Sequence, residues 1–231
     1  TIISGMATEI SEDPKRWATE GSEVISRNAG NLLNLINQIL ALSKIESGSM
    51  PLHMVQGDIV SYLGYVVDAF RGHALAKRIK LHFLAEEAEV IMDYDQEKYM
   101  TILSNLISNA IKFTPEEGNV YVSLVFRDMG EDSVFELTVR DTGIGIPPEE
   151  LEHIFERFYQ ALNELTGSGI GTGIGLSLVH ELVKMLEGEI QVRSAQDKGT
   201  TFTITFPLRK ETINPGAPVM KEDIRSNINF L

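Results

Sequence analysis

The sequence predicts an α+β protein in which a two-layer α/β sandwich follows a helical hairpin. Three observations support this fold class. A long segment from Lys15 to Glu46 has apolar residues at helical spacing, and beyond it runs of period two alternate with helical patterns. Strands come in pairs before a helix, and this order favours a two-layer sandwich over a doubly wound parallel sheet.

Residues 1–47 form the first predicted unit, a helical hairpin. Thr1 to Ile10 can supply a short helix, and the turn Ser11-Glu12-Asp13-Pro14 carries residues that start the long helix ending near Glu46. The long helix has two neighbouring apolar stripes and therefore needs more than one partner. This pattern is typical of a hairpin that forms a four-helix bundle on dimerisation.

Residues 48–208 form the second predicted unit, and residues 209–231 read as a linker or tail. The helical pattern ends at Ser47-Gly48-Ser49-Met50-Pro51, which predicts a domain boundary. Helices are predicted over residues 58–76, 95–113 and 176–186, and strands over residues 120–126, 134–139 and 202–206. The last stretch contains Pro215, Gly216 and Pro218 and has no clear period.

Composition excludes several classes of function. The 33 acidic and 20 basic residues give a formal charge of −13, which disfavours nucleic acid and direct contact with an anionic membrane. Cysteine is absent, so thiolate metal sites and cysteine nucleophiles are excluded. No apolar run reaches the roughly 18 to 20 residues of a membrane span. We expect a cytoplasmic piece of a longer protein, because the chain opens at Thr1 in mid-pattern.

A polar stripe interrupts the apolar helix predicted over residues 95–113. In the stretch LSNLISNAIKFTPEEG, Asn105 and Asn109 are four residues apart and Lys112 follows three residues later. Residues at this spacing share one face of a helix. One isolated asparagine would be explained by bridging a neighbouring loop, so the meaning of the stripe depends on the rest of the chain.

A glycine-containing turn follows the strand predicted over residues 134–139. Its sequence is Asp141-Thr142-Gly143-Ile144-Gly145-Ile146-Pro147. A lone D-x-G-x-G is compatible with an ordinary hairpin turn. At a strand end, however, the Asp141 carboxylate can accept a hydrogen bond from an exocyclic amine, while the glycines let a ring approach the backbone. This combination suits adenine.

A second glycine-rich stretch, Gly167 to Leu176, leads into the last predicted helix. Glycines before a helix expose backbone N–H groups and the positive end of the helix dipole, which suits phosphate. The stretch lacks the lysine of a Walker A loop, and flexible loops can look similar. Phe155 and Phe158 lie between the two glycine segments, where core packing would explain them. In Gly199-Thr200-Thr201-Phe202, a hydroxyl could reach the same base, although β-propensity also explains threonine.

The segments together are far more specific than any one of them. In this order, N-L-x-x-N-A-x-K-F, D-T-G-I-G, F-x-x-F, G-T-G-I-G-L and G-T-x-F resemble the N, G1, F, G2 and G3 boxes of sensor histidine kinases of two-component systems. Residues 50–208 resemble their catalytic ATP-binding domain, which has the Bergerat fold. Residues 1–47 resemble the remainder of their dimerisation and phosphotransfer hairpin.

The resemblance implies a site for ATP and Mg²⁺. It assigns Mg²⁺ to Asn109, phosphate contacts to Asn105 and Lys112, the adenine amine to Asp141, and a ring against adenine to Phe113. Residues from about 161 to 172 would form a lid over the nucleotide. The implied nucleotide-binding residues are Asn105, Asn109, Lys112, Phe113, Asp141, Gly143, Gly145, Ile146, Gly171, Thr172, Gly173, Gly175, Leu176 and Thr200. Many relatives have arginine where this chain has Gln160, which leaves the γ-phosphate to another cation such as Arg157.

The acceptor histidine implied by the resemblance is absent from the chain. It belongs to an H-E-[LF]-R-[TN]-P-L-T context, of which Thr1 could be the last residue. None of the five histidines stands in such a context; they are His53, His73, His82, His153 and His180. We therefore expect a histidine kinase fragment that binds Mg-ATP without phosphorylating itself.

The resemblance also implies partners and a location. The hairpin would form a homodimer, and the partner would be the receiver domain of a response regulator, separate or fused. The intact protein would be anchored in the bacterial inner membrane. The alternatives are a nucleotide-gated ATPase module of the gyrase or chaperone type, which lacks such a hairpin, and a pseudokinase, which intact nucleotide boxes disfavour.

Overall fold

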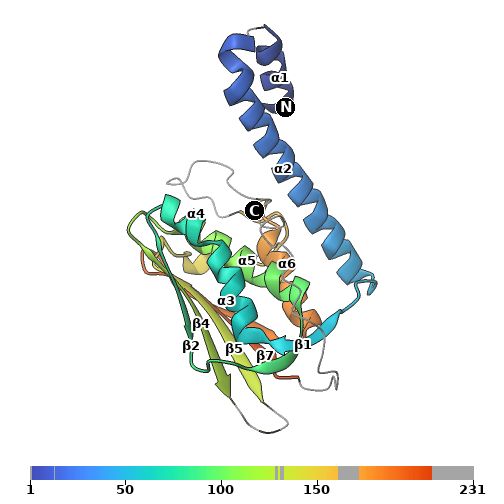
Figure 1. The fold of residues 1–231 in the computed structure, drawn as a ribbon, viewed down its shortest axis with the longest axis vertical. Coiled ribbons are helices and arrows are strands. Elements are labelled where there is room, and N and C mark those ends of the chain that lie inside the picture. Colours follow the sequence, from blue (N-terminus) through green and yellow to red (C-terminus); the bar gives the residue numbers. More distant parts are fainter. Residues whose placement is uncertain (1, 13, 128–129, 131–132, 161–171, 210–231) are drawn as a thin grey trace.

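The computed structural model describes residues 2–12, 14–127, 130, 133–160 and 172–209. Two helices at the N-terminus project from a sandwich made of one helix layer and one sheet (Figure 1). The predicted fold class is therefore confirmed. The linker predicted over residues 209–231 lies outside the described residues, apart from Arg209.

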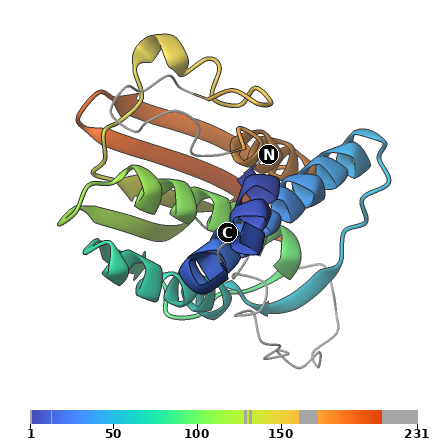
Figure 2. The ribbon, with the colours of Figure 1, turned by 90° about the horizontal axis from the view of Figure 1, so that it is seen from above.

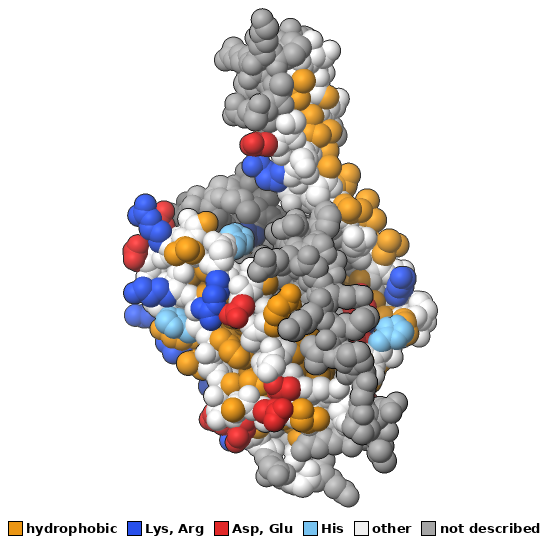
Figure 3. Space-filling view, in the orientation of Figure 1, with side chains coloured by type: hydrophobic (Ala, Val, Ile, Leu, Met, Phe, Trp, Pro, Cys, Tyr) orange, Lys and Arg blue, Asp and Glu red, His pale blue; other side chains and the backbone are white. Residues whose placement is uncertain are grey.

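The projecting part consists of α1 (Ile2–Glu12) and α2 (Pro14–Glu46). The short helix α1 lies beside the N-terminal part of α2, as the hairpin prediction requires (Figure 1). Apolar side chains follow one side of α2 in the space-filling view (Figure 3). The exposed ones are Leu32, Leu33, Ile36, Ile39 and Leu40. Among the residues that the structure describes, one of the two predicted apolar stripes is thus largely exposed.

A ribbon of two antiparallel strands connects the hairpin to the sandwich. Strand β1 (Met54–Asp58) pairs with β3 (Ile91–Asp95), and each strand ends in an aspartate that caps the next helix. Asp58 accepts hydrogen bonds from the backbone N–H groups of Val60 and Ser61, and Asp95 accepts one from Lys98. These carboxylates satisfy N–H groups that have no partner inside the helix, which fixes where α3 and α5 begin.

The sheet has five strands in the order β2-β4-β5-β7-β6. They are β2 (Lys80–Ala85), β4 (Asn119–Arg127), β5 (Val134–Asp141), β6 (Glu189–Ala195) and β7 (Gly199–Pro207). The pairing β2–β4 is parallel, and the other three pairings are antiparallel. Alternate residues of β4, β5 and β7 are buried, as period two requires.

Three helices cover one face of the sheet: α3 (Ile59–Ala69), α5 (Gln96–Phe113) and α6 (Gly175–Met185) (Figures 1 and 2). The core lies between the two layers, where Leu63, Leu106 and Val179 from the helices and Leu137 and Ile204 from the sheet are almost completely buried. Burial of this apolar surface is the main stabilising contribution and holds α5 against β5.

The helix predicted over residues 58–76 is two helices in the structure, α3 and α4 (Arg71–Ala76). The break is at Phe70, whose N–H bonds the Val67 carbonyl three residues back in a tighter turn. Because this turn redirects the chain, both Phe70 and Ala74 are buried in the core. A helical period cannot show such a break, since the apolar spacing continues through it.

Candidate nucleotide site

The polar stripe of α5 has the geometry that the sequence predicts. Asn105 is buried, and its Nδ2 donates a hydrogen bond to the Thr101 carbonyl at 2.7 Å. Asn109 lies one turn later and is half-buried, and its amide forms no hydrogen bond with the described residues. An amide oxygen in this state can serve as a hard neutral ligand for a cation that also binds phosphate.

The last turn of α5 combines a cation and a ring. The Lys112 ammonium lies 4.5 Å from the centroid of the Phe113 ring, and 36% of Phe113 is exposed. Burial lowers the pKa of Lys112, and the nearby charge of Lys77 lowers it further. The charged form of Lys112 is therefore less favoured than that of an exposed lysine, and a nearby anion would favour it.

Asp141, the last residue of β5, lies in a buried position at the end of the strand. Its Oδ1 accepts hydrogen bonds from the N–H groups of Gly143 (2.8 Å) and Thr200 (3.2 Å). Within the described residues, Oδ2 has no hydrogen bond. Burial raises the pKa of Asp141, although the two backbone hydrogen bonds act in the opposite direction. One oxygen is thus fixed by the fold, and the other can accept a hydrogen bond from a ligand.

The loop after Asp141 packs tightly against two neighbouring segments. A Cβ on Gly143 would lie 2.5 Å from the Phe113 carbonyl oxygen, and Gly145 has a φ of +69° with its α-carbon facing the Ala195 backbone. Side chains at these positions would push the loop away from α5 or from β6. The Ile146 N–H donates to Ser194 Oγ at 2.8 Å, and Ser194 Oγ also pairs with Thr200 Oγ1.

The second glycine segment meets the polar stripe of α5. Gly175 opens α6, and a Cβ there would lie 2.6 Å from Asn105 Oδ1. The N-cap residue of α6 is Ile174, whose apolar side chain cannot accept a hydrogen bond. The first backbone N–H groups of α6 therefore donate no hydrogen bond to an N-cap side chain. The positive end of the α6 dipole therefore lies beside Asn105, on the polar stripe that also carries Asn109, which suits a phosphate chain.

We expect Gly175→Ala to weaken ATP binding severalfold while leaving adenosine binding nearly unchanged. The new methyl group would displace the Asn105 amide from its position beside α6. Stability should change little, because alanine is the better helix former by about 1 kcal/mol and a lost hydrogen bond costs about as much. Calorimetry with both ligands checks this. Gly72→Ala is the control, since a Cβ there would meet nothing within 4 Å; equal effects of the two substitutions would contradict the prediction.

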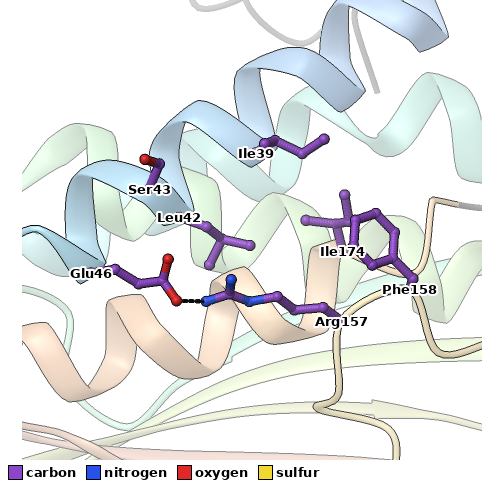
Figure 4. Close-up of a pocket in the computed structure, with 7 residues that line it drawn as sticks. All are labelled: Ile39, Leu42, Ser43, Glu46, Arg157, Phe158 and Ile174. Carbon is purple, nitrogen blue, oxygen red and sulfur yellow. Dashed lines mark hydrogen bonds and ion pairs between the residues drawn. The ribbon is translucent and has the colours of Figure 1, made fainter.

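Helix α2 packs against the segment between the two glycine loops. The Arg157 guanidinium is paired with the Glu46 carboxylate, and Thr172 Oγ1 donates to Gln38 Oε1 at 3.0 Å. An open pocket of about 190 Å³ lies beside this contact. Its lining includes Ile39 and Leu42 of α2 and, across from them, Ile174 and Phe158 (Figure 4). It is smaller than the roughly 300 Å³ at which ligand pockets begin, and Asp141 does not line it. Arg157, suggested above for the γ-phosphate, is engaged by α2 in this structure.

The structure brings most predicted site residues together. Contacts between Asn105 and Gly175, between Phe113 and Gly143, and between Asp141 and Thr200 join the N, G1, G2 and G3 segments around one place. Phe158 N–H donates to the Gly173 carbonyl, which joins the F segment to them. Gly171 and the lid predicted over residues 161–172 lie outside the described residues, except for Thr172. Leu176, in the first turn of α6, is half-buried.

Sequence reasoning missed three side chains that shape the site. Ser194 ties the G1 loop to the start of β7, Thr142 Oγ1 accepts the Asn119 N–H, and Lys77 contacts the end of α5. Ser194 stands in an alternating strand and Lys77 in a polar turn, so neither residue carries a local signal. Among the described histidines, His82 stacks on Tyr121, His153 is paired with Glu156, and His180 of α6 stacks on Phe155.

The site contains no group of three or more acidic or histidine side chains able to hold a metal by themselves, among the described residues. Among the described residues, no helix has both the length and the apolar character needed to cross a bilayer.

A two-layer sandwich with a strand-end carboxylate, an amide-bearing helix and a glycine-rich helix start defines an ATP-binding domain of the type found in histidine kinases. The chain belongs to the family described as histidine kinase-, DNA gyrase B-, and HSP90-like ATPase, whose model matches residues 94–210. The resemblance drawn from the sequence is therefore confirmed.

Curated relatives and solved structures agree with this family. Sensor histidine kinase WalK of Bacillus subtilis (strain 168) is 32% identical over 190 residues, which are 81% of this chain and 30% of WalK. The chain thus spans less than a third of that relative. Full-length ShkA in complex with AMPPNP has a TM-score of 0.72 at 24% identity, over 85% of this chain and 40% of ShkA. Histidine kinase ThkA in complex with response regulator TrrA has a TM-score of 0.67 at 21% identity, over 90% and 57%.

Proposed function

We propose that this chain is the kinase part of a two-component sensor histidine kinase, which binds Mg-ATP and transfers the γ-phosphoryl group to a histidine upstream of residue 1. The observation that carries the proposal is the meeting of Asn105 with Gly175 at the start of α6. It places a neutral amide stripe beside the positive end of a helix, with the Asp141 carboxylate in the same site. The amide stripe and the start of the helix would bind the triphosphate, and the carboxylate would bind adenine.

In this proposal each described group has one task. Asp141 Oδ2 accepts the adenine amine, the Phe113 ring packs against the base, and Asn105 and Lys112 contact the phosphates. Asn109 would hold Mg²⁺, which bridges the phosphates and neutralises their charge. Phosphoryl transfer requires little covalent chemistry from the protein, so catalysis would rest on positioning and on electrostatic stabilisation.

The hairpin would supply dimerisation and the acceptor. We assign residues 1–47 to the dimerisation and phosphotransfer hairpin, residues 48–208 to the catalytic domain and residues 209–231 to a linker or tail. The exposed apolar side of α2 supports a homodimer that completes a four-helix bundle. The response regulator bound by the similar kinase ThkA supports a receiver domain as the partner. We place the fragment in the cytoplasm and the intact protein at the bacterial inner membrane.

The gyrase-like or chaperone-like alternative, in which ATP binding closes a dimer without phosphoryl transfer, is less well supported. The curated relatives that align with most of this chain include sensor histidine kinases, and the alignments extend beyond the ATPase family match. The hairpin before the sandwich also favours the kinase.

The test is labelling from γ-labelled ATP. We expect the 231-residue chain to bind Mg-ATP without labelling itself, because none of its histidines stands in an acceptor context. The chain extended by its native upstream segment should become labelled, and the phosphate should be acid-labile and base-stable. Replacing the upstream histidine should abolish labelling without affecting ATP binding.

Two outcomes would contradict the proposal. An extended chain that binds Mg-ATP but stays unlabelled would favour the nucleotide-gated module. Strong acid-labile labelling of the present 231 residues would mean that His53, His73, His82, His153 or His180 is the acceptor, and that the hairpin alignment is wrong.

A further inference from the structure

Lys77 lies in the turn between α4 and β2, and its ammonium group binds the C-terminal end of α5. Its Nζ donates to the carbonyl oxygens of Ile111 (2.8 Å) and Lys112 (2.8 Å), and to that of Thr114 at a longer 3.4 Å. The last carbonyls of a helix have no partner inside it, and a cation there also interacts favourably with the helix dipole. An ammonium group has three donors, and all three of its N–H groups are directed at the end of α5.

The segment that Lys77 holds forms one wall of the candidate nucleotide site. It carries the Lys112 ammonium and the Phe113 ring, and the Phe113 carbonyl accepts the Ile144 N–H at 3.3 Å. Gly143 lies against the same carbonyl. Any shift of the α5 end would therefore move the ring and the loop after Asp141 together.

The turn that carries Lys77 is itself fixed to the loop that follows α5. The Glu117 N–H donates to the Arg78 carbonyl at 3.1 Å, and the Lys80 N–H donates to the Gly118 carbonyl at 3.0 Å. These backbone hydrogen bonds fix the position of the turn relative to the loop. The Lys77 side chain connects this turn to the final carbonyls of α5 itself.

We propose that Lys77 is a positioning residue for the nucleotide: by binding the Ile111, Lys112 and Thr114 carbonyls, it sets where the Phe113 ring and the Lys112 ammonium meet the ligand. The inference rests on the proposed ATP-binding function. Lys77 does not contact the nucleotide in this account, because its donors are occupied by the backbone. Its effect reaches the ligand through the end of α5.

The test compares Lys77→Met with three other variants. Lys80→Met removes the same charge from an exposed neighbour on β2. Val66→Ala destabilises the buried core from α3 and removes no hydrogen-bonding group from the end of α5. Lys77→Arg keeps the charge, but its planar fork cannot place three donors on three converging carbonyls. All four are measured by calorimetry with Mg-ATP and with adenosine, at a temperature where each is folded.

We expect Lys77→Met to weaken binding of both ligands about tenfold, equivalent to about 1.4 kcal/mol, and Lys77→Arg to recover only part of this loss. Lys80→Met and Val66→Ala should bind within about twofold of the unmodified chain. A second readout needs no ligand: exchange of the Ile144 amide hydrogen, followed by NMR, should become faster in Lys77→Met, less so in Lys77→Arg, and should not change in Lys80→Met.

The inference is overturned if Lys77→Met binds as well as the unmodified chain, if Lys77→Arg restores binding fully, or if Val66→Ala causes the same loss. The first result would mean that Lys77 only caps the helix and does not affect the ligand. The second would mean that Lys77 acts through its charge and not through its three hydrogen bonds. The third would mean that the loss of binding follows from lower stability in general. Failure of the unmodified chain to bind Mg-ATP would instead refute the proposed function.

Discussion

Asp141→Asn should weaken ATP and adenosine binding while leaving the free protein at least as stable as before. The asparagine Oδ1 can still accept the N–H groups of Gly143 and Thr200. Its amide nitrogen would then replace Oδ2 and would present a donor to the adenine amine, which is also a donor. A buried unsatisfied group costs about 1 to 3 kcal/mol, so the dissociation constant should rise roughly fivefold to 150-fold.

The pH dependence of this variant has a defined sign. Burial raises the pKa of Asp141 in the folded chain above its ordinary value, so the ionised carboxylate destabilises the fold at neutral pH. This cost disappears as the pH falls through the raised pKa, and asparagine never has it. The stability advantage of Asp141→Asn should therefore be present at neutral pH and should shrink on acidification.

Binding should show the same titration. Adenosine affinity of the unmodified chain should begin to fall, on acidification, above the pH at which an exposed aspartate titrates, and the Asn variant should show no such fall. Adenosine is used because it has no phosphates to titrate. Asp68→Asn, at an exposed position of α3, is the control. Equal affinities of the unmodified chain for ATP and GTP would remove the assignment of Asp141 to adenine.

Asn109→Ala should abolish the dependence of ATP binding on Mg²⁺ and leave adenosine binding nearly intact. The side chain lies on the same face of α5 as Asn105, and its amide forms no hydrogen bond with the described residues, so its removal breaks no hydrogen bond among them. Because it is the proposed protein ligand of the cation, the affinity gained from Mg²⁺ should fall roughly tenfold or more, equivalent to about 1.4 kcal/mol.

Titrations of ATP with Mg²⁺ and with EDTA measure this effect. Ser108→Ala is the matched control, because Ser108 precedes Asn109 on the same helix and is also half-buried. If magnesium enhancement survives in Asn109→Ala, the protein ligand of the cation lies elsewhere. If adenosine binding falls as much as ATP binding, the residue acts on the shape of the site and not on the metal.

The local sequence pattern was sufficient to locate the helices and strands whose apolar residues repeat with a clear period. The apolar spacing of α2 and α5 and the alternation in β4, β5 and β7 gave their positions to within a few residues, because a side-chain period reports directly on a buried face. The strands β1, β2, β3 and β6 were missed. They are short or edge strands, and their burial patterns do not alternate clearly or alternate only between half-buried and exposed.

The sequence by itself determined the class of site, because the order of an amide stripe, a strand-end aspartate and a glycine-rich helix start restricts the chemistry to a nucleotide. It could not determine which groups touch. The Lys77 ammonium on the α5 carbonyls, Ser194 between two loops and Arg157 on Glu46 join residues 34 to 111 positions apart. Such contacts depend on how helices and sheet pack together, and no local period records them; only the tertiary structure decided them.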